Sequence, residues 1–116
     1  MSVQIGHEAT SGLVIEYWKL LRSYERTAGE LPESKAQKVQ AQIRYSAQRL
    51  SQVLTDASVQ LVCFDGEPFS PELPVSAINA EDLVGCENPT IERTIEPTLL
   101  QNGVVLHMGK VLLKGA

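Results

Sequence analysis

The run Leu99-Leu100-Gln101-Asn102-Gly103-Val104-Val105-Leu106 decides how the second half of this chain folds. It places two short apolar segments on either side of an Asn-Gly pair. Asn and Gly both tolerate a positive φ angle, which the two central residues of a type I′ turn require. Two apolar segments separated by such a pair are the strongest short-range sequence pattern for a β-hairpin. The sequence therefore predicts a hairpin that turns at Asn102 and Gly103.

Strand patterns also surround this hairpin. Four further segments have strand character: Val59–Phe64, Val75–Ala80, Thr90–Glu96 and Val111–Leu113. Pro97 cannot donate to a strand ladder, so we expect it at an edge or a bulge, and we expect a loop over residues 81–89. These patterns predict a small C-terminal β-domain over residues 59–116, which we call the head.

The residues before the head have helical periodicity. From about Ser11 to Ala28, apolar residues recur at three- and four-residue steps, as on one face of a helix: Leu13, Tyr17, Leu20, Leu21 and Tyr24. Gly29–Pro32 should end this helix, and a second should run to about Ala57. Its apolar residues occupy the a and d positions of a seven-residue repeat: Ala36, Val39, Ile43, Leu50, Val53 and Ala57. Residues 1–10 have no clear period, and we expect them to be frayed.

This helical hairpin, residues 11–58, carries more apolar surface than one hairpin can bury. The stripe on its second helix is narrow, which would leave much of Val14, Trp18 and Tyr45 exposed. Two hairpins from two chains would cover that surface by forming a four-helix bundle. The sequence thus predicts an α+β homodimer, with these residues at the dimer interface: Leu13, Tyr17, Trp18, Leu21, Val39, Ile43 and Leu50.

Charge is unevenly divided between the two halves. Residues 1–58 carry seven basic and six acidic residues, a net charge of +1, whereas residues 59–116 carry three and eight, a net charge of −5. Because phosphate binding needs clustered Lys and Arg, the head is not expected to bind nucleic acid. It would suit a basic protein partner. We interpret the basic residues of the second helix as a solvated face: Lys35, Lys38, Arg44 and Arg49.

The residue patterns of enzymes and metal sites are missing. The sequence has no P-loop, no GxGxxG, no HExxH and no nucleophile elbow. His7 and His107 lie far apart in the sequence, and nothing marks a Ser or Cys as their partner. Cys63 and Cys86 lack the spacing of a metal site, and Cys63 is interpreted as a buried thiol. We therefore expect a binding protein without a cofactor or metal, and not an enzyme.

No apolar run approaches the roughly 18 residues that a membrane span needs, and the N-terminal residues do not have the pattern of a signal peptide. The expected location is the cytoplasm, with no membrane partner.

The order of these patterns resembles the GrpE family, the nucleotide exchange factors of the DnaK-type heat-shock chaperone. Gly66-Glu67-Pro68-Phe69-Ser70-Pro71 resembles the family's G-E-x-F-D-P loop, and residues 100–113 resemble its closing pattern of a leucine-rich strand, Asn-Gly and alternating Val. The family's Asp is Ser70 here, the Arg after the turn Gly is Val104, and the Arg of the last hairpin is His107. Because the first helix is expected to begin near residue 11, the long N-terminal paired helix of the family is not expected in this sequence.

The resemblance implies a dimer held by a four-helix bundle, with heads that bind the chaperone's nucleotide-binding domain and promote ADP release. The residues it suggests for partner binding are Gly66, Glu67, Phe69, Pro71, Glu72, Asn102, Gly103, His107 and Lys110. For Gly66 and Gly103, plain turn geometry is an equally good explanation. Two alternatives stay open: a diverged dimeric scaffold or adaptor that binds another protein without exchange activity, and a small enzyme.

Overall fold

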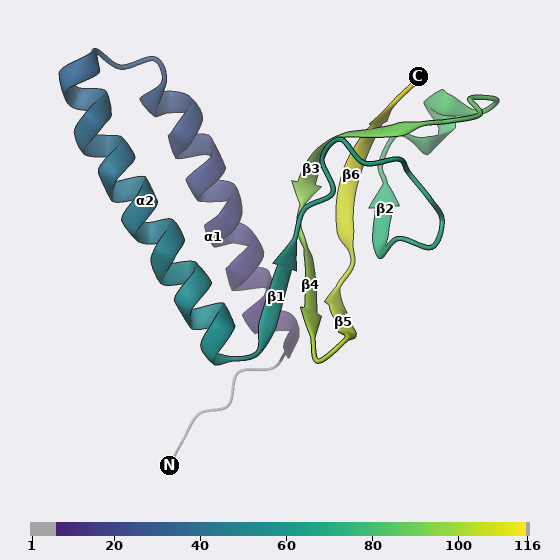
Figure 1. The fold of residues 1–116 in the computed structure, drawn as a ribbon, viewed down its shortest axis with the longest axis horizontal. Helices are drawn as coiled ribbons and strands as arrows, with labels where there is room; N and C mark the ends of the chain where they lie inside the picture. The colour runs from purple at the N-terminus through teal and green to yellow at the C-terminus, as the bar shows by residue number, and fades with distance from the viewer. Residues whose placement is uncertain (1–6, 116) are drawn as a thin grey trace. The chain divides into compact units, whose positions relative to one another are not determined.

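The structure, a computed structural model, describes residues 7–115 and has an α+β fold (Figure 1). Within these residues, two helices are followed by six strands and one short 3₁₀ helix. The chain divides after Ser58 into two compact units, the helical hairpin and the head. The division falls where the apolar period of the sequence changes from helical to strand-like.

The first helix, α1, spans His7–Ala28 and so begins earlier than the sequence pattern suggested. The prediction that residues 1–10 are frayed is therefore wrong for residues 7–10, and residues 1–6 lie outside the described residues. Glu8 lies in the first turn of α1. A carboxylate there is stabilised by the positive end of the helix dipole, which favours the additional turn.

The second helix, α2, spans Glu33–Asp56 and follows a short linker. Pro32 precedes its first residue, and the carbonyl oxygen of Pro32 accepts hydrogen bonds from the backbone N–H groups of Lys35 and Ala36. Proline suits this position because its φ is already helical and it removes a donor that a helix start leaves unpaired. Beyond α2, Ser58 has a φ of 59°, a left-handed conformation that ends the helix and directs the chain into the first strand.

The two helices contact each other along one face of each. The hydroxyl of Tyr17 donates to the carbonyl oxygen of Ser46 at 2.9 Å, and the hydroxyl of Tyr24 lies 3.5 Å from Oε1 of Gln42. Ile43 is buried within this single chain. Both tyrosines therefore tie α1 to α2 by their polar ends and leave part of each ring exposed.

The head is built around one long antiparallel ribbon that is bent in the middle (Figure 1). One side consists of β3 (Thr90–Glu96) and β4 (Thr98–Gln101), and the other of β5 (Val104–His107) and β6 (Gly109–Lys114). The two sides are joined by the turn at Asn102 and Gly103, whose φ angles are 51° and 80°. Both angles are positive, so the hairpin predicted from the Asn-Gly pair is confirmed.

Each half of the ribbon gains one further strand. β1 (Val59–Val62) pairs antiparallel with β4, so that β4 lies between β1 and β5 in one sheet. β2 (Val75–Ala77) pairs parallel with β6, so that β6 lies between β2 and β3 in the other. The core of the head forms on the second sheet, from Val75, Ile91, Val111 and Leu113. Phe64, Phe69, Leu73, Ala77 and Leu83 pack around it.

The strand predicted over Val75–Ala80 is shorter in the structure, because a side chain takes over its hydrogen bonds. The side-chain Nδ2 of Asn79 donates to the carbonyl oxygen of Leu113 at 2.9 Å, and the side-chain Oδ1 of Asn79 accepts from the Leu113 N–H at 2.8 Å. With this pairing made by the side chain, the backbone turns into a 3₁₀ helix over Ala80–Leu83, where the sequence predicts a loop. The strand predicted over Val59–Phe64 likewise ends early, at Val62.

At the bend, the two sides of the ribbon are in close contact. Thr98 is fully buried, and its hydroxyl donates to the carbonyl oxygen of Pro74 at 2.8 Å while accepting from the Gly109 N–H at 3.2 Å. A Cβ atom on Gly109 would lie 2.6 Å from the Thr98 hydroxyl oxygen and 2.8 Å from the carbonyl oxygen of Glu96. Pro97, expected at an edge or bulge, separates β3 from β4 at this point and is buried.

Candidate functional site

The residues suggested for partner binding lie in three separate parts of the head. Gly66–Glu72 form a loop beside the start of β3, because the backbone N–H of Gly66 donates to the carbonyl oxygen of Ile91 and that of Phe69 to the carbonyl oxygen of Pro89. Asn102 and Gly103 form the turn at the far end of the ribbon (Figure 1). His107 and Lys110 lie near the bend. The structure therefore does not bring the nine residues into one continuous patch.

The loop Gly66–Glu72 exposes some of its residues and uses others for packing. Glu67, Pro71 and Glu72 are exposed, so their side chains are available to a partner. Gly66 has a φ of 84° and open space where a side chain would extend, which is a turn requirement rather than a close approach. Phe69 is half-buried against the core of the head, so most of its ring serves the fold. Of the five residues suggested for partner binding in this loop, only Glu67, Pro71 and Glu72 therefore have exposed side chains.

A carboxylate that the sequence analysis did not single out joins the two residues near the bend. Oε1 of Glu96 lies 3.0 Å from Nε2 of His107 and 3.8 Å from Nζ of Lys110. The Glu96 side chain is 12% exposed, whereas that of Lys110 is 52% exposed. Both partners reach Glu96 because the ribbon pairs it with Lys110 and brings β5 alongside. No local sequence pattern indicates this cluster, since the ribbon's register and bend create it.

The helical hairpin exposes a continuous apolar stripe on α1. Its members recur at three- and four-residue steps and are Leu13, Tyr17, Leu20 and Tyr24. Leu13 is 64% exposed and Leu20 is 70% exposed. Among the other residues expected at the dimer interface, Trp18, Leu21, Val39 and Leu50 are half-buried. Ile43 is buried in the single hairpin, so it offers little surface to a second chain.

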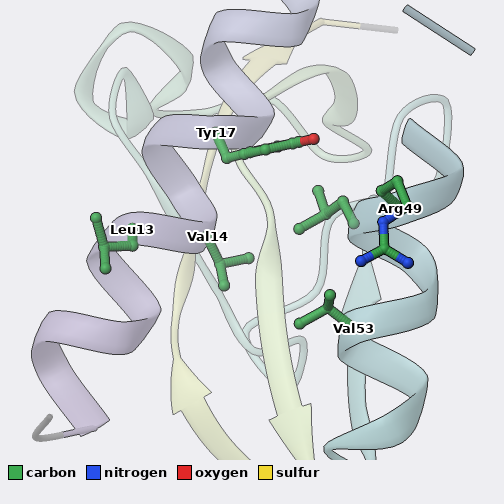
Figure 2. A pocket seen from close by; sticks show the side chains of 6 residues that line it. Leu13, Val14, Tyr17, Arg49 and Val53 are labelled. Atoms are coloured by element: carbon green, nitrogen blue, oxygen red, sulfur yellow. The ribbon is translucent and has the colours of Figure 1, made fainter. Parts of the chain in front are cut away.

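An open groove of about 300 Å³ continues this stripe onto α2. Figure 2 shows Val14 and Tyr17 extending from α1 towards α2, where Arg49 and Val53 lie opposite. Leu13 and Leu50 complete the lining. The groove is therefore apolar, with a single guanidinium among its lining residues.

The aromatic ring of Trp18 has a cationic neighbour. The guanidinium carbon of Arg22 lies 4.8 Å from the centroid of the Trp18 ring. This distance allows a cation–π interaction. One face of the half-buried Trp18 ring is therefore in contact with a side chain of the same helix.

The part of the chain that the structure describes holds no group of three or more His, Cys, Asp and Glu residues placed to bind a metal ion. Cys63 and Cys86 are half-buried and are not joined in a disulfide. Neither of the described helices is long and apolar enough to cross a membrane.

Comparisons with known proteins return nothing: no family model, no curated protein and no solved structure matches this chain.

Proposed function

We propose that this chain is a cytoplasmic, GrpE-like co-chaperone that acts as a homodimer and binds the nucleotide-binding domain of a DnaK-type chaperone to promote ADP release. The observation that carries the proposal is the order of elements: a helical hairpin, then a β-head whose longest ribbon turns at an Asn-Gly pair. This order of elements resembles that of the GrpE family.

The dimer is the first part of the proposal. Two helical hairpins would pair through α1 and α2 into a four-helix bundle, a common way for amphipathic helices to cover their apolar sides. The exposed stripe that includes Leu13 and Leu20, and the apolar groove next to it, support this arrangement because they leave large aliphatic side chains in water. Burying one leucine side chain contributes about 1.5–3 kcal/mol, so several together favour association.

Partner binding is the second part. The head would bind the open, nucleotide-free form of the chaperone more tightly than the closed form, and that difference in affinity alone shifts the equilibrium towards ADP release. Glu67 and Glu72 on the loop are the side chains best placed to meet a basic surface, since both are exposed. Asn102 and Gly103 would add a contact at the tip of the ribbon.

The test is the rate at which a fluorescent ADP analogue leaves a DnaK-type chaperone from the same source. We expect the purified protein to increase that rate in a concentration-dependent manner. A control with an unrelated helical protein should leave the rate unchanged. An unchanged rate with this protein, combined with normal folding, would rule out exchange activity.

One observation favours the second candidate function, a dimeric adaptor that binds another protein without exchange activity. Where the family has an arginine in its last hairpin, this chain has His107, and Glu96 already engages its Nε2 at 3.0 Å. A side chain held in this way is less available to a chaperone than a free arginine. Binding to a chaperone without faster ADP release, or no binding at all, would favour the adaptor.

A further inference from the structure

The outer edge of β5 is an unpaired strand edge. β5 lies at the end of the β1-β4-β5 sheet, and no other described strand pairs with it beyond β4. Val104 is 63% exposed and Val105 is 45% exposed, and they point to opposite faces of the sheet because successive residues alternate. Met108, directly after β5, is also exposed. A strand edge flanked by apolar side chains on both faces is a template for another strand.

The other long strand edges of the head are covered or polar. The outer side of β3 is closed by the segment before it: the backbone N–H of Ile91 donates to the carbonyl oxygen of Glu67, and Pro68 forms a bridge with Thr90. β1, at the opposite edge from β5, has Gln60 as its exposed residue. β2, the remaining edge strand, has Ser76 as its exposed residue, so among the described edge strands β5 is the one whose exposed residues are apolar.

The register of the hairpin shows which backbone groups face outward. Gln101 and Val104 flank a two-residue turn, so they exchange hydrogen bonds with each other, and Val105, opposite Leu100, is in the next, non-hydrogen-bonded pair. The N–H and C=O of Val105 therefore point away from β4. The register shift between Leu99 and Leu100 keeps the regular edge short, so a docking strand would span only a few residues.

Charge determines which strand could dock there. β5 carries no Lys, Arg, Asp or Glu, while the head as a whole has eight acidic and three basic residues, a net charge of −5. A second copy of the head would bring another −5 and be repelled. An extended segment that alternates apolar and basic residues would place its apolar side chains on Val104 or Val105 and its cations in the field of the head.

We propose that the outer edge of β5 binds an extended, basic segment of a partner protein by adding it as a further strand to the β1-β4-β5 sheet. Main-chain hydrogen bonds to Val105 supply the affinity, and Val104, Val105 and Met108 supply the apolar contacts. The inference rests on the proposed function for the identity of the partner, a chaperone, but the edge itself can be tested without one.

The experiment uses the full chain and three synthetic six-residue peptides with blocked ends. The first alternates Lys and Val, the second alternates Glu and Val, and the third is the Lys-Val peptide with every residue N-methylated. Backbone amide NMR shifts and hydrogen exchange are followed residue by residue. We expect the Lys-Val peptide to shift the β5 amides and to slow exchange at Val105 several-fold, with less effect as salt is added. The other two peptides should do neither.

The three peptides separate the outcomes. No change at β5 with the Lys-Val peptide overturns the proposal, as does equal binding by the N-methylated peptide, which would show that main-chain hydrogen bonds are not used. Equal binding by the Glu-Val peptide overturns the charge argument and with it the choice of partner. If the Lys-Val peptide binds β5 but no chaperone binds the protein, the proposed function fails and the β5 site stands.

Discussion

At the scale of single residues, Gly109 is the glycine of the head that leaves least room for a side chain. The two sides of the ribbon come so close at the bend that a Cβ on Gly109 would meet both a side chain and backbone. The threonine hydroxyl could rotate away, but the carbonyl oxygen of Glu96, at 2.8 Å from the added Cβ, cannot move without shifting the strand. The requirement here is space, because Gly109 does not have a positive φ.

We expect Gly109→Ala to lower the free energy of unfolding of the head by about 1–3 kcal/mol, the usual cost of adding a methyl group to a packed site. Gly115→Ala is the matched control, since its Cβ would lie 3.8 Å from Sγ of Cys86, an ordinary van der Waals distance. Urea unfolding of both variants, followed by the far-UV signal, measures the difference. Equal midpoints would show that the bend is looser than its contacts indicate.

At the scale of elements, the Asn102–Gly103 turn sets the register of the ribbon. We expect Gly103→Val to destabilise the head more than Gly115→Val, because a β-branched residue is strained at a φ of 80° whereas residue 115 lies past the last strand. An outlier of this kind costs about 1–3 kcal/mol. Thermal unfolding of the two variants is the measurement, and equal melting temperatures would count against the turn as a determinant of the fold.

The helical hairpin is the element on which the proposed dimer depends. We expect the wild-type protein to sediment as a dimer at micromolar concentration, and the double variant Leu13→Lys, Leu20→Lys to sediment as a monomer, because two cations would enter the apolar stripe. Val84→Lys is the control, since Val84 is 85% exposed on the head and outside the stripe. A wild-type monomer, or a double variant that still dimerises, would contradict the helical interface.

At the scale of the whole molecule, the division of charge predicts how association responds to salt. We expect Glu67→Lys with Glu72→Lys to slow association with a chaperone and to flatten its salt dependence, because the net charge of the head changes from −5 to −1. The steering field of exposed charges is screened over about 8 Å at physiological ionic strength. Both glutamates are exposed, so the fold should stay intact.

The matched control reverses two charges on the other unit, with Lys35→Glu and Lys38→Glu. Association with immobilised chaperone, measured across a salt series, should change little for this variant, because the proposed contacts lie on the head. A large loss with the lysine variant, or none with the glutamate variant, would move the binding site from the head to the helices.

Much of the local structure could be predicted from the sequence, because periodicity and turn residues act on nearby backbone. The three- and four-residue steps predicted both helices, and the Asn-Gly pair predicted the turn that the φ angles of Asn102 and Gly103 confirm. The strand Thr90–Glu96 has the bounds that its pattern suggested. Each of these features depends on residues that lie within a few positions of one another.

The tertiary structure alone decided how distant segments meet. The side chain of Asn79 ends β2 by hydrogen bonding to the backbone of Leu113, 34 residues further along the chain. Position 109 requires a glycine because a Cβ atom there would collide with the side chain of Thr98. Glu96 meets His107 and Lys110 only because the ribbon has this register and this bend. The helices and the turn could be predicted from nearby residues, but the candidate site could not. Pairing across a sheet is fixed by packing and turn geometry together, and no single stretch of the sequence carries that information.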